Sequence, residues 1–153
     1  YAEIANDNSE GQIVLSGKNK DLVKMGLFLK ENKIKNIKLP VSAPFHCSMM
    51  KNATNIMREE LGRLKFKKGS NPLISNITAN EIFNADELKD LLIKQIENRV
   101  RWRESVINMI NKGVKQFIEI GPGKVLSGLI KRINKEVNVC SINNEEEIKN
   151  IKI

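Results

Sequence analysis

The sequence predicts an α/β fold in which a small antiparallel α+β unit precedes a longer alternation of helices and strands. Over residues 1–39, two strand-like runs, one helical run and a third strand-like run follow each other, an order typical of a small antiparallel unit. Beyond residue 50, helical runs alternate with short apolar runs, which favours a parallel sheet. The segment 39–50 separates the two parts and contains the only histidine of the chain, His46.

Glycine and asparagine mark the limits of the elements in the first part. Residues 12–16 (QIVLS) lie between two glycines and are predicted to form a strand, with a shorter strand at 3–6. From Asn19, a candidate N-cap, apolar residues recur at helical spacing for about 13 residues. Residues 34–39 (IKNIKL) alternate apolar and basic side chains, which predicts a half-exposed strand.

The second part is predicted to begin with a helix capped by Ser48. A later helix is expected to start at Asn84 or Asp86, and Gly113 is expected to end another. The tail after the last predicted strand either frays or forms a final helix. The predicted helices cover residues 48–64, 86–96, 102–112 and 124–133, and the predicted strands cover residues 72–76, 116–120 and 137–141.

Composition bounds the class of protein. The 153 residues fit one domain of ordinary size, and no run of about 18 apolar residues predicts a membrane span. Cys47 and Cys140 have the spacing of neither a disulfide framework nor a metal site, so we expect no metal and a reducing compartment. The chain starts at Tyr1 rather than methionine, and we expect it to be a piece of a longer protein.

The formal net charge of +8 favours acidic partners. Nucleic acid is one candidate and an acidic carrier protein is another, whereas a solvated basic face needs no partner. No helix-turn-helix, zinc-finger or aromatic-interleaved basic motif occurs, so nucleic-acid binding is the weaker interpretation.

His46 is the first candidate for chemistry. Pro44 restricts the backbone before it, and a helix is predicted directly after it, so the histidine is expected on a rigid loop. A single histidine is more often a packed or surface residue than a catalytic one, and both readings stay open on these grounds. A second candidate, Gly121-Pro-Gly-Lys124, follows a strand and opens a helix. It lacks the length and the Ser or Thr of a Walker A loop, which favours a tight turn over a phosphate site.

Five segments, in order over most of the chain, carry a resemblance to one enzyme family. They are N-S-E-G-Q-I-V (8–14), S-A-P-F-H-C-S (42–48), N-P-L-I-S-N (71–76), V-R-W-R-E-S-V (100–106) and F-I-E-I-G-P-G-K-V-L-S-G-L-I-K-R-I (117–133). They resemble segments of the malonyl-CoA:acyl carrier protein transacylases, with Glu10 where that family usually has proline.

The resemblance implies the C-terminal portion of such an enzyme. Residues 1–39 would form most of a ferredoxin-like small subdomain that lacks its N-terminal part. Residues 40–153 would form the C-terminal part of the large, α/β-hydrolase-like acyltransferase subdomain. The nucleophile elbow G-x-S-x-G occurs nowhere in the chain. The serine would therefore come from outside these residues.

The resemblance also assigns site residues. His46 would be the general base, and the backbone carbonyl of Gln95 would hold its second ring nitrogen. Asn8 resembles a residue lining the active-site cleft, although an Asx turn before a strand explains it equally well. Phe45 matches malonyl-selective members, although a core aromatic is the alternative. Arg99 stands where the family often has proline.

The function implied is malonyl transfer from malonyl-CoA to the phosphopantetheine thiol of acyl carrier protein in fatty acid biosynthesis, by a ping-pong serine–histidine route. No cofactor is implied beyond the coenzyme A thioester substrate. The alternative is a catalytically incomplete piece that only binds or assembles. We also expect self-association through surface that a missing part would cover. The expected location is a bacterial cytoplasm, with a plastid-type organelle as the alternative.

Overall fold

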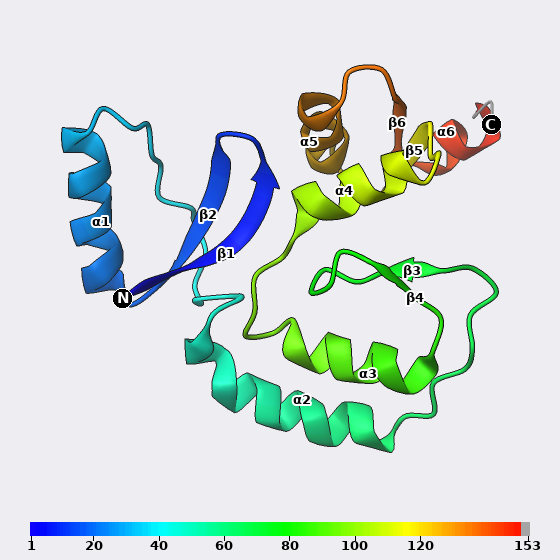
Figure 1. The fold of residues 1–153 in the computed structure, drawn as a ribbon, viewed down its shortest axis with the longest axis horizontal. Helices are drawn as coiled ribbons and strands as arrows, with labels where there is room; N and C mark the ends of the chain where they lie inside the picture. Colours follow the sequence, from blue (N-terminus) through cyan, green and yellow to red (C-terminus); the bar gives the residue numbers. More distant parts are fainter. Residues whose placement is uncertain (151–153) are drawn as a thin grey trace.

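The computed structural model describes residues 1–150 and is a mixed α/β structure, as predicted. Within these residues, the strands form three two-stranded sheets: β1–β2, β3–β4 and β5–β6. Figure 1 shows the β1–β2 hairpin beside helix α1, with α2 and α3 running side by side beneath β3–β4. Helices α4 and α5 lie with β5 and β6 in the remaining part of the molecule.

The first unit is an antiparallel hairpin followed by a helix. β1 (Ala2–Ser9) is longer than predicted, and it pairs with β2 (Gln12–Gly17) through a ladder with two irregularities. α1 (Asn19–Glu31) has the predicted extent, but Lys18 is its N-cap and no side chain caps it, so the Asn19 cap is wrong. The helix ends with Lys33 in the left-handed region at φ 58°. The Ile34 amide then donates to the Leu29 carbonyl, as in a Schellman motif.

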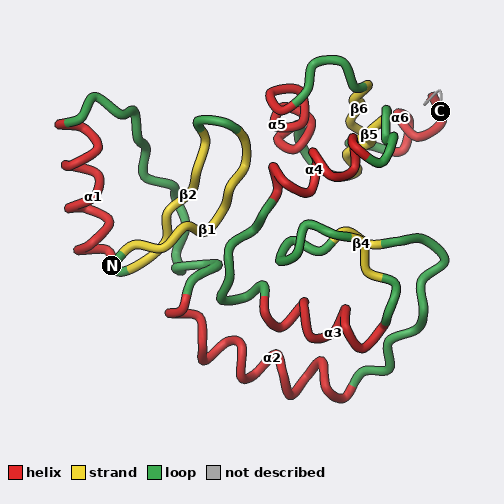
Figure 2. Tube along the Cα trace, viewed as in Figure 1, coloured by secondary structure: helices red, strands yellow, loops and turns green. Residues whose placement is uncertain are grey.

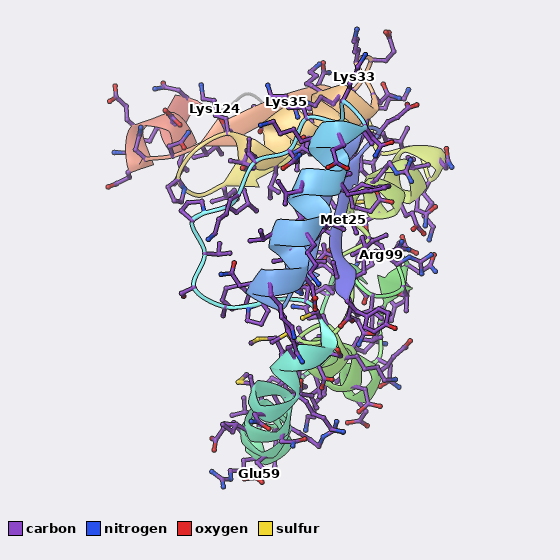
Figure 3. The ribbon with its side chains drawn as sticks, turned by 90° about the vertical axis from the view of Figure 1, so that its left-hand side faces the viewer. Met25, Lys33, Lys35, Glu59, Arg99 and Lys124 are labelled. Carbon is purple, nitrogen blue, oxygen red and sulfur yellow. The ribbon has the colours of Figure 1, made fainter. Side chains whose placement is uncertain are left out.

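The strand predicted at 34–39 is wrong, because the segment forms a long connection without regular structure (Figure 2). A strand needs a partner for its backbone groups, and none of the residues 1–150 pairs with this segment. Ile37 is 76% exposed. The Asn36 side chain instead donates to the Gly26 carbonyl at 3.3 Å, which holds the connection against α1. Figure 3 looks onto α1, with Met25 midway along it and Lys33 and Lys35 beyond its C-terminal end.

The middle of the chain forms two helices and a small hairpin. A 3₁₀ turn, η1 (Ser48–Met50), leads into α2 (Lys51–Arg63). β3 (Leu73–Ile74) pairs antiparallel with β4 (Glu81–Ile82), a strand that the sequence patterns did not predict. α3 (Ala85–Lys94) is capped by Asn84, one of the two predicted caps, whose side chain accepts from the Asp86 and Glu87 amides.

The last part contains the parallel pair that the sequence predicted. α4 (Trp102–Asn111) ends before Gly113, whose φ is 94°. β5 (Gln116–Ile120) pairs parallel with β6 (Asn138–Ile142) through the crossover helix α5 (Val125–Ile133). α6 (Glu145–Asn150) follows.

The hydrophobic core lies between α4, α5 and the β5–β6 pair. Val106, Ile130 and Val137 are buried at its centre. Met109 and Ile110 on α4 pack against them. This core fixes the direction of α4. It thereby helps to place the segment 95–101 that precedes α4 and begins at Gln95, whose carbonyl contacts His46.

β1 ties the two predicted parts of the chain together. Its residue Ala5 accepts a hydrogen bond from the Val100 amide at 2.8 Å, and the Asp7 amide donates to the Val100 carbonyl at 2.9 Å. The buried carboxylate of Asp7 also pairs with Arg103 at 2.9 Å. β1 thus bonds to the chain on both sides of residue 39. The division into 1–39 and 40–153 stays a prediction.

Across residues 1–150, no helix combines the length and the apolar character that crossing a bilayer requires.

Candidate functional site

The imidazole of His46 is held by the end of α3. Its Nδ1 lies 2.7 Å from the backbone carbonyl oxygen of Gln95, the C-cap residue of that helix. A carbonyl can only accept, so Nδ1 must carry the proton. In the neutral ring, the lone pair therefore lies on Nε2. The side chain is half-buried, which leaves part of the ring accessible.

The backbone of His46 adopts a conformation that few side chains take. Its φ is 59°, in the left-handed region that costs a non-glycine residue about 1–2 kcal/mol. Such strain persists only where the surroundings hold it, and it occurs mostly at functional sites. Cys47 supplies part of that hold, because its side chain is fully buried and its Sγ donates to the Pro44 carbonyl at 3.1 Å.

Gln95 is fixed by a residue that sequence reasoning did not select. The side-chain amide of Asn76 donates to the Gln95 side-chain oxygen at 3.3 Å. The backbone carbonyl of Asn76 accepts from the Arg101 amide at 2.9 Å. Asn76 thereby joins the end of α3 to the segment that pairs with β1. The N-P-L-I-S-N segment was visible in the sequence, but no local pattern showed that its last residue reaches Gln95.

Ser48 does not cap a helix, so that prediction is wrong. Cys47 is the N-cap of η1 and makes no side-chain cap bond. Both the amide and the hydroxyl of Ser48 instead donate to the carboxylate of Glu3, with amide distances of 3.2 and 3.3 Å. Glu3 lies on β1, 45 residues away in sequence, and no local signal pointed to it.

The structure brings only some of the candidate residues together. His46 and Gln95 are in contact, and Phe45 precedes His46 with 49% of its surface exposed. Asn8 is half-buried at a register shift of β1, where a bulge can redirect a side chain. Among residues 1–150, no hydrogen bond joins the Asn8 side chain to His46 or Gln95.

Two of the arginines that follow Gln95 share one carboxylate. Glu104 accepts from Arg101, and it pairs with Arg99 at 3.4 Å. The hydrogen bond from Arg101 lowers the pKa of Glu104 below its ordinary value and raises the pKa of Arg101. At the position where the family often has proline, Arg99 is thus an ion-pair partner of Glu104. Figure 3 labels it beside the hairpin.

The Gly121–Gly123 turn keeps its backbone donors within the protein. The Gly123 amide donates to the Asn143 side chain at 2.6 Å, and the Gly121 amide donates to the Ile142 carbonyl at 3.0 Å. At the start of α5, Glu119 accepts from the Leu126 and Ser127 amides at 3.0 and 2.7 Å. These groups are already bonded, which supports the tight-turn interpretation over a phosphate cradle.

No group of three or more His, Cys, Asp or Glu side chains within residues 1–150 is placed to hold a metal ion. The contacts of His46 give the site a tautomer-fixed imidazole on a strained turn. Such a group can take a proton at Nε2 and return it.

Comparisons with known proteins agree along nearly the whole chain. The malonyl CoA-acyl carrier protein transacylase of Bacillus subtilis is 41% identical over 147 residues, which are 95% of this chain and 46% of that protein. A crystal structure of the enzyme of that name from Clostridium perfringens has a TM-score of 0.92 at 41% identity, covering 98% of this chain and 48% of the other. No family model matches the chain.

A third comparison includes a partner. A malonyl-transacylase in complex with a type II PKS acyl-carrier protein has a TM-score of 0.92 at 32% identity, and the match covers 97% of this chain and 48% of that one. The chain spans about half the length of the curated relatives it matches, and the matching half is their C-terminal one. The resemblance seen in the five segments and the α/β acyltransferase fold are thus confirmed. Over nearly its whole length, the chain is homologous to the C-terminal half of the malonyl CoA-acyl carrier protein transacylases.

Proposed function

We propose that this chain supplies the general-base histidine and part of the substrate site of a malonyl-CoA:acyl carrier protein transacylase. The observation that carries the proposal is the 2.7 Å contact between His46 Nδ1 and the Gln95 carbonyl, within segments that match this family. The Gln95 carbonyl performs the role that an aspartate has in a serine protease, because it fixes the imidazole tautomer and leaves Nε2 as the base.

The reaction is a transfer through a serine ester. A serine from outside these residues loses its proton to Nε2 of His46 as its oxygen attacks the malonyl thioester. The carbon–sulfur bond breaks, and the imidazolium protonates the departing coenzyme A thiolate. In the second half, the phosphopantetheine thiol of the carrier protein loses its proton to Nε2 and attacks the ester, and the serine regains a proton. Phe45 would crowd a 2-methyl branch on the acyl group, and Asn8 would line the cleft.

The partner proposed is an acidic acyl carrier protein. The chain has an excess of basic residues and a net charge of +8, and a relative of similar fold binds an acyl-carrier protein. We place the activity in a bacterial cytoplasm, in keeping with the bacterial relatives.

The test is a chimera in which this chain replaces the matching part of the Bacillus subtilis relative. His46→Ala in that chimera should lower malonyl transfer by about 10²–10⁴-fold, the usual contribution of a general base. Glu31→Ala, an exposed substitution on α1, is the control and should transfer at the unsubstituted rate. Near-normal transfer by His46→Ala would refute the proposed base.

The alternative of a piece that only binds or assembles is favoured by the missing G-x-S-x-G. Incubation of the isolated chain with labelled malonyl-CoA separates the two. A covalent adduct on this chain would contradict the alternative, and it would also contradict the need for an external serine.

A further inference from the structure

We propose that Glu3 is a positioning residue for His46, acting by clamping the turn on which the histidine sits. This inference deepens the proposed function and rests on it. Among residues 1–150, the hydrogen bonds of the Glu3 carboxylate go to Ser48 and none goes to the imidazole. It acts through Ser48, two residues after His46.

The clamp consists of one carboxylate and two donors on a single residue. Glu3 Oε2 lies 3.2 Å from the Ser48 amide, Oε1 lies 3.3 Å from it, and the Ser48 hydroxyl also donates to Oε1. The Glu3 side chain is half-buried on β1, and β1 is bonded to β2 on one side and to Val100 on the other. A hydrogen bond to a charged group from such an anchored strand is stronger than a neutral one.

His46 needs such a hold because its backbone is strained. At φ 59° the residue would relax to an extended conformation if its neighbours released it, and the ring would then move. Cys47, directly after the histidine, is buried and its thiol donates across the turn to the Pro44 carbonyl, while the Gln95 carbonyl holds the ring itself. Glu3 supplies the hold after the turn. Without it, the 3₁₀ turn at Ser48 is tied to β1 by no other hydrogen bond among the described residues.

The consequence is a strand-to-turn frame around the imidazole. β1 reaches Ser48 through Glu3, and it reaches the segment after Gln95 through Val100. The same strand therefore sets both the backbone of the histidine and the path of the chain that carries the carbonyl it bonds. Without Glu3, the turn that carries His46 should move relative to the segment that carries the Gln95 carbonyl. Nδ1 and that carbonyl would then no longer meet in one fixed geometry.

The test uses the single histidine of the chain. Nitrogen-15 NMR of the isolated 153-residue protein reports directly which ring nitrogen carries the proton, without overlap from other histidines. The wild-type neutral ring should be Nδ1-protonated. Glu3→Ala should give a mixture of both tautomers, because the fixing bond is lost. Glu3→Gln keeps an oxygen acceptor and should restore the Nδ1-protonated form. Glu31→Ala removes the same charge elsewhere and should leave the spectrum unchanged.

Activity in the chimera gives the second readout. Glu3→Ala should lower kcat by about ten- to a hundred-fold with little change in KM, since a misplaced base slows chemistry rather than binding. Ser48→Ala is the milder variant, and in its background Glu3→Ala should lose part of its effect, as expected for two residues in one contact.

Two results would overturn the proposal. The first is that Glu3→Ala keeps both the tautomer and the kcat of the unsubstituted protein. The second is that Glu3→Gln restores neither the Nδ1-protonated tautomer nor kcat. These results are separable from a failure of the proposed function. If His46→Ala transfers malonate normally, the histidine is not the base, yet the tautomer in Glu3→Ala still decides whether Glu3 holds the ring.

Discussion

The left-handed backbone of His46 predicts that glycine is more stable than alanine at this position, the reverse of the usual order. At ordinary positions alanine is more stable than glycine by about 0.4–1 kcal/mol, because glycine gains more freedom in the unfolded chain. At φ 59° a side chain costs about 1–2 kcal/mol that glycine avoids. The difference leaves His46→Gly more stable than His46→Ala by about 1 kcal/mol. Both variants lose the imidazole and its bond to Gln95, so that loss cancels in the comparison.

The assay is urea unfolding followed by the fluorescence of Trp102, the only tryptophan. The two variants should share one m-value and differ in midpoint, with glycine at the higher urea concentration. Lys33, an exposed residue that is also in the left-handed region, should show the same order. Phe45, whose φ is not positive, should show the ordinary order. Equal midpoints for His46→Gly and His46→Ala, or a higher midpoint for alanine, would refute the strained turn.

Substitutions at three further positions and one measurement on the unmodified chain test the rest of the fold. Val106→Ala should lower the free energy of unfolding by about 2 kcal/mol in urea, because it removes two buried methyl groups from the centre of the core; an effect below about 0.5 kcal/mol would contradict that packing. Asn84→Ala should cost about 1 kcal/mol by loss of the α3 cap, and Asn84→Asp should cost far less, as measured by the same assay. Bonds from Ser127 and Leu126 lower the pKa of Glu119 below its ordinary value of 4.5, so its stabilisation is complete above that value and is lost as pH falls through the lower, folded-state pKa. Glu119→Gln should therefore flatten the fall in the free energy of unfolding on acidification, and an unchanged pH profile would be evidence against this contact. Exposed apolar side chains on β5 and at the start of α5 should make the isolated chain self-associate, and light scattering that shows only monomer would contradict this.

The sequence was sufficient wherever one short window contains the physical signal. α1, α4 and the parallel pair follow from apolar spacing, and Asn84 and Gly113 mark helix ends because capping depends on neighbouring backbone groups. The turn before η1 was also readable, since Pro44 and the helical run after it restrict the chain locally.

Sequence reasoning failed where an element depends on a partner. The IKNIKL segment has the alternation of a strand, but no described residue pairs with it, and it forms a connection instead. β4 is two residues long and exists because β3 lies opposite it, so its own residues carry almost no pattern. Ser48 has the residue type of a cap, but it is the first residue of η1 rather than its N-cap, and its amide and hydroxyl both donate to the Glu3 carboxylate.

The sequence by itself determined that a lone histidine lies on a restricted turn between two patterned regions, and five matching segments indicated its chemistry. Only the tertiary structure decided what surrounds the ring: Gln95 lies 49 residues away along the chain, and Glu3 reaches Ser48 over 45. Local patterns encode the backbone preferences of a few neighbouring residues. Contacts across tens of residues arise only when packing brings β1, α3 and the turn to one place.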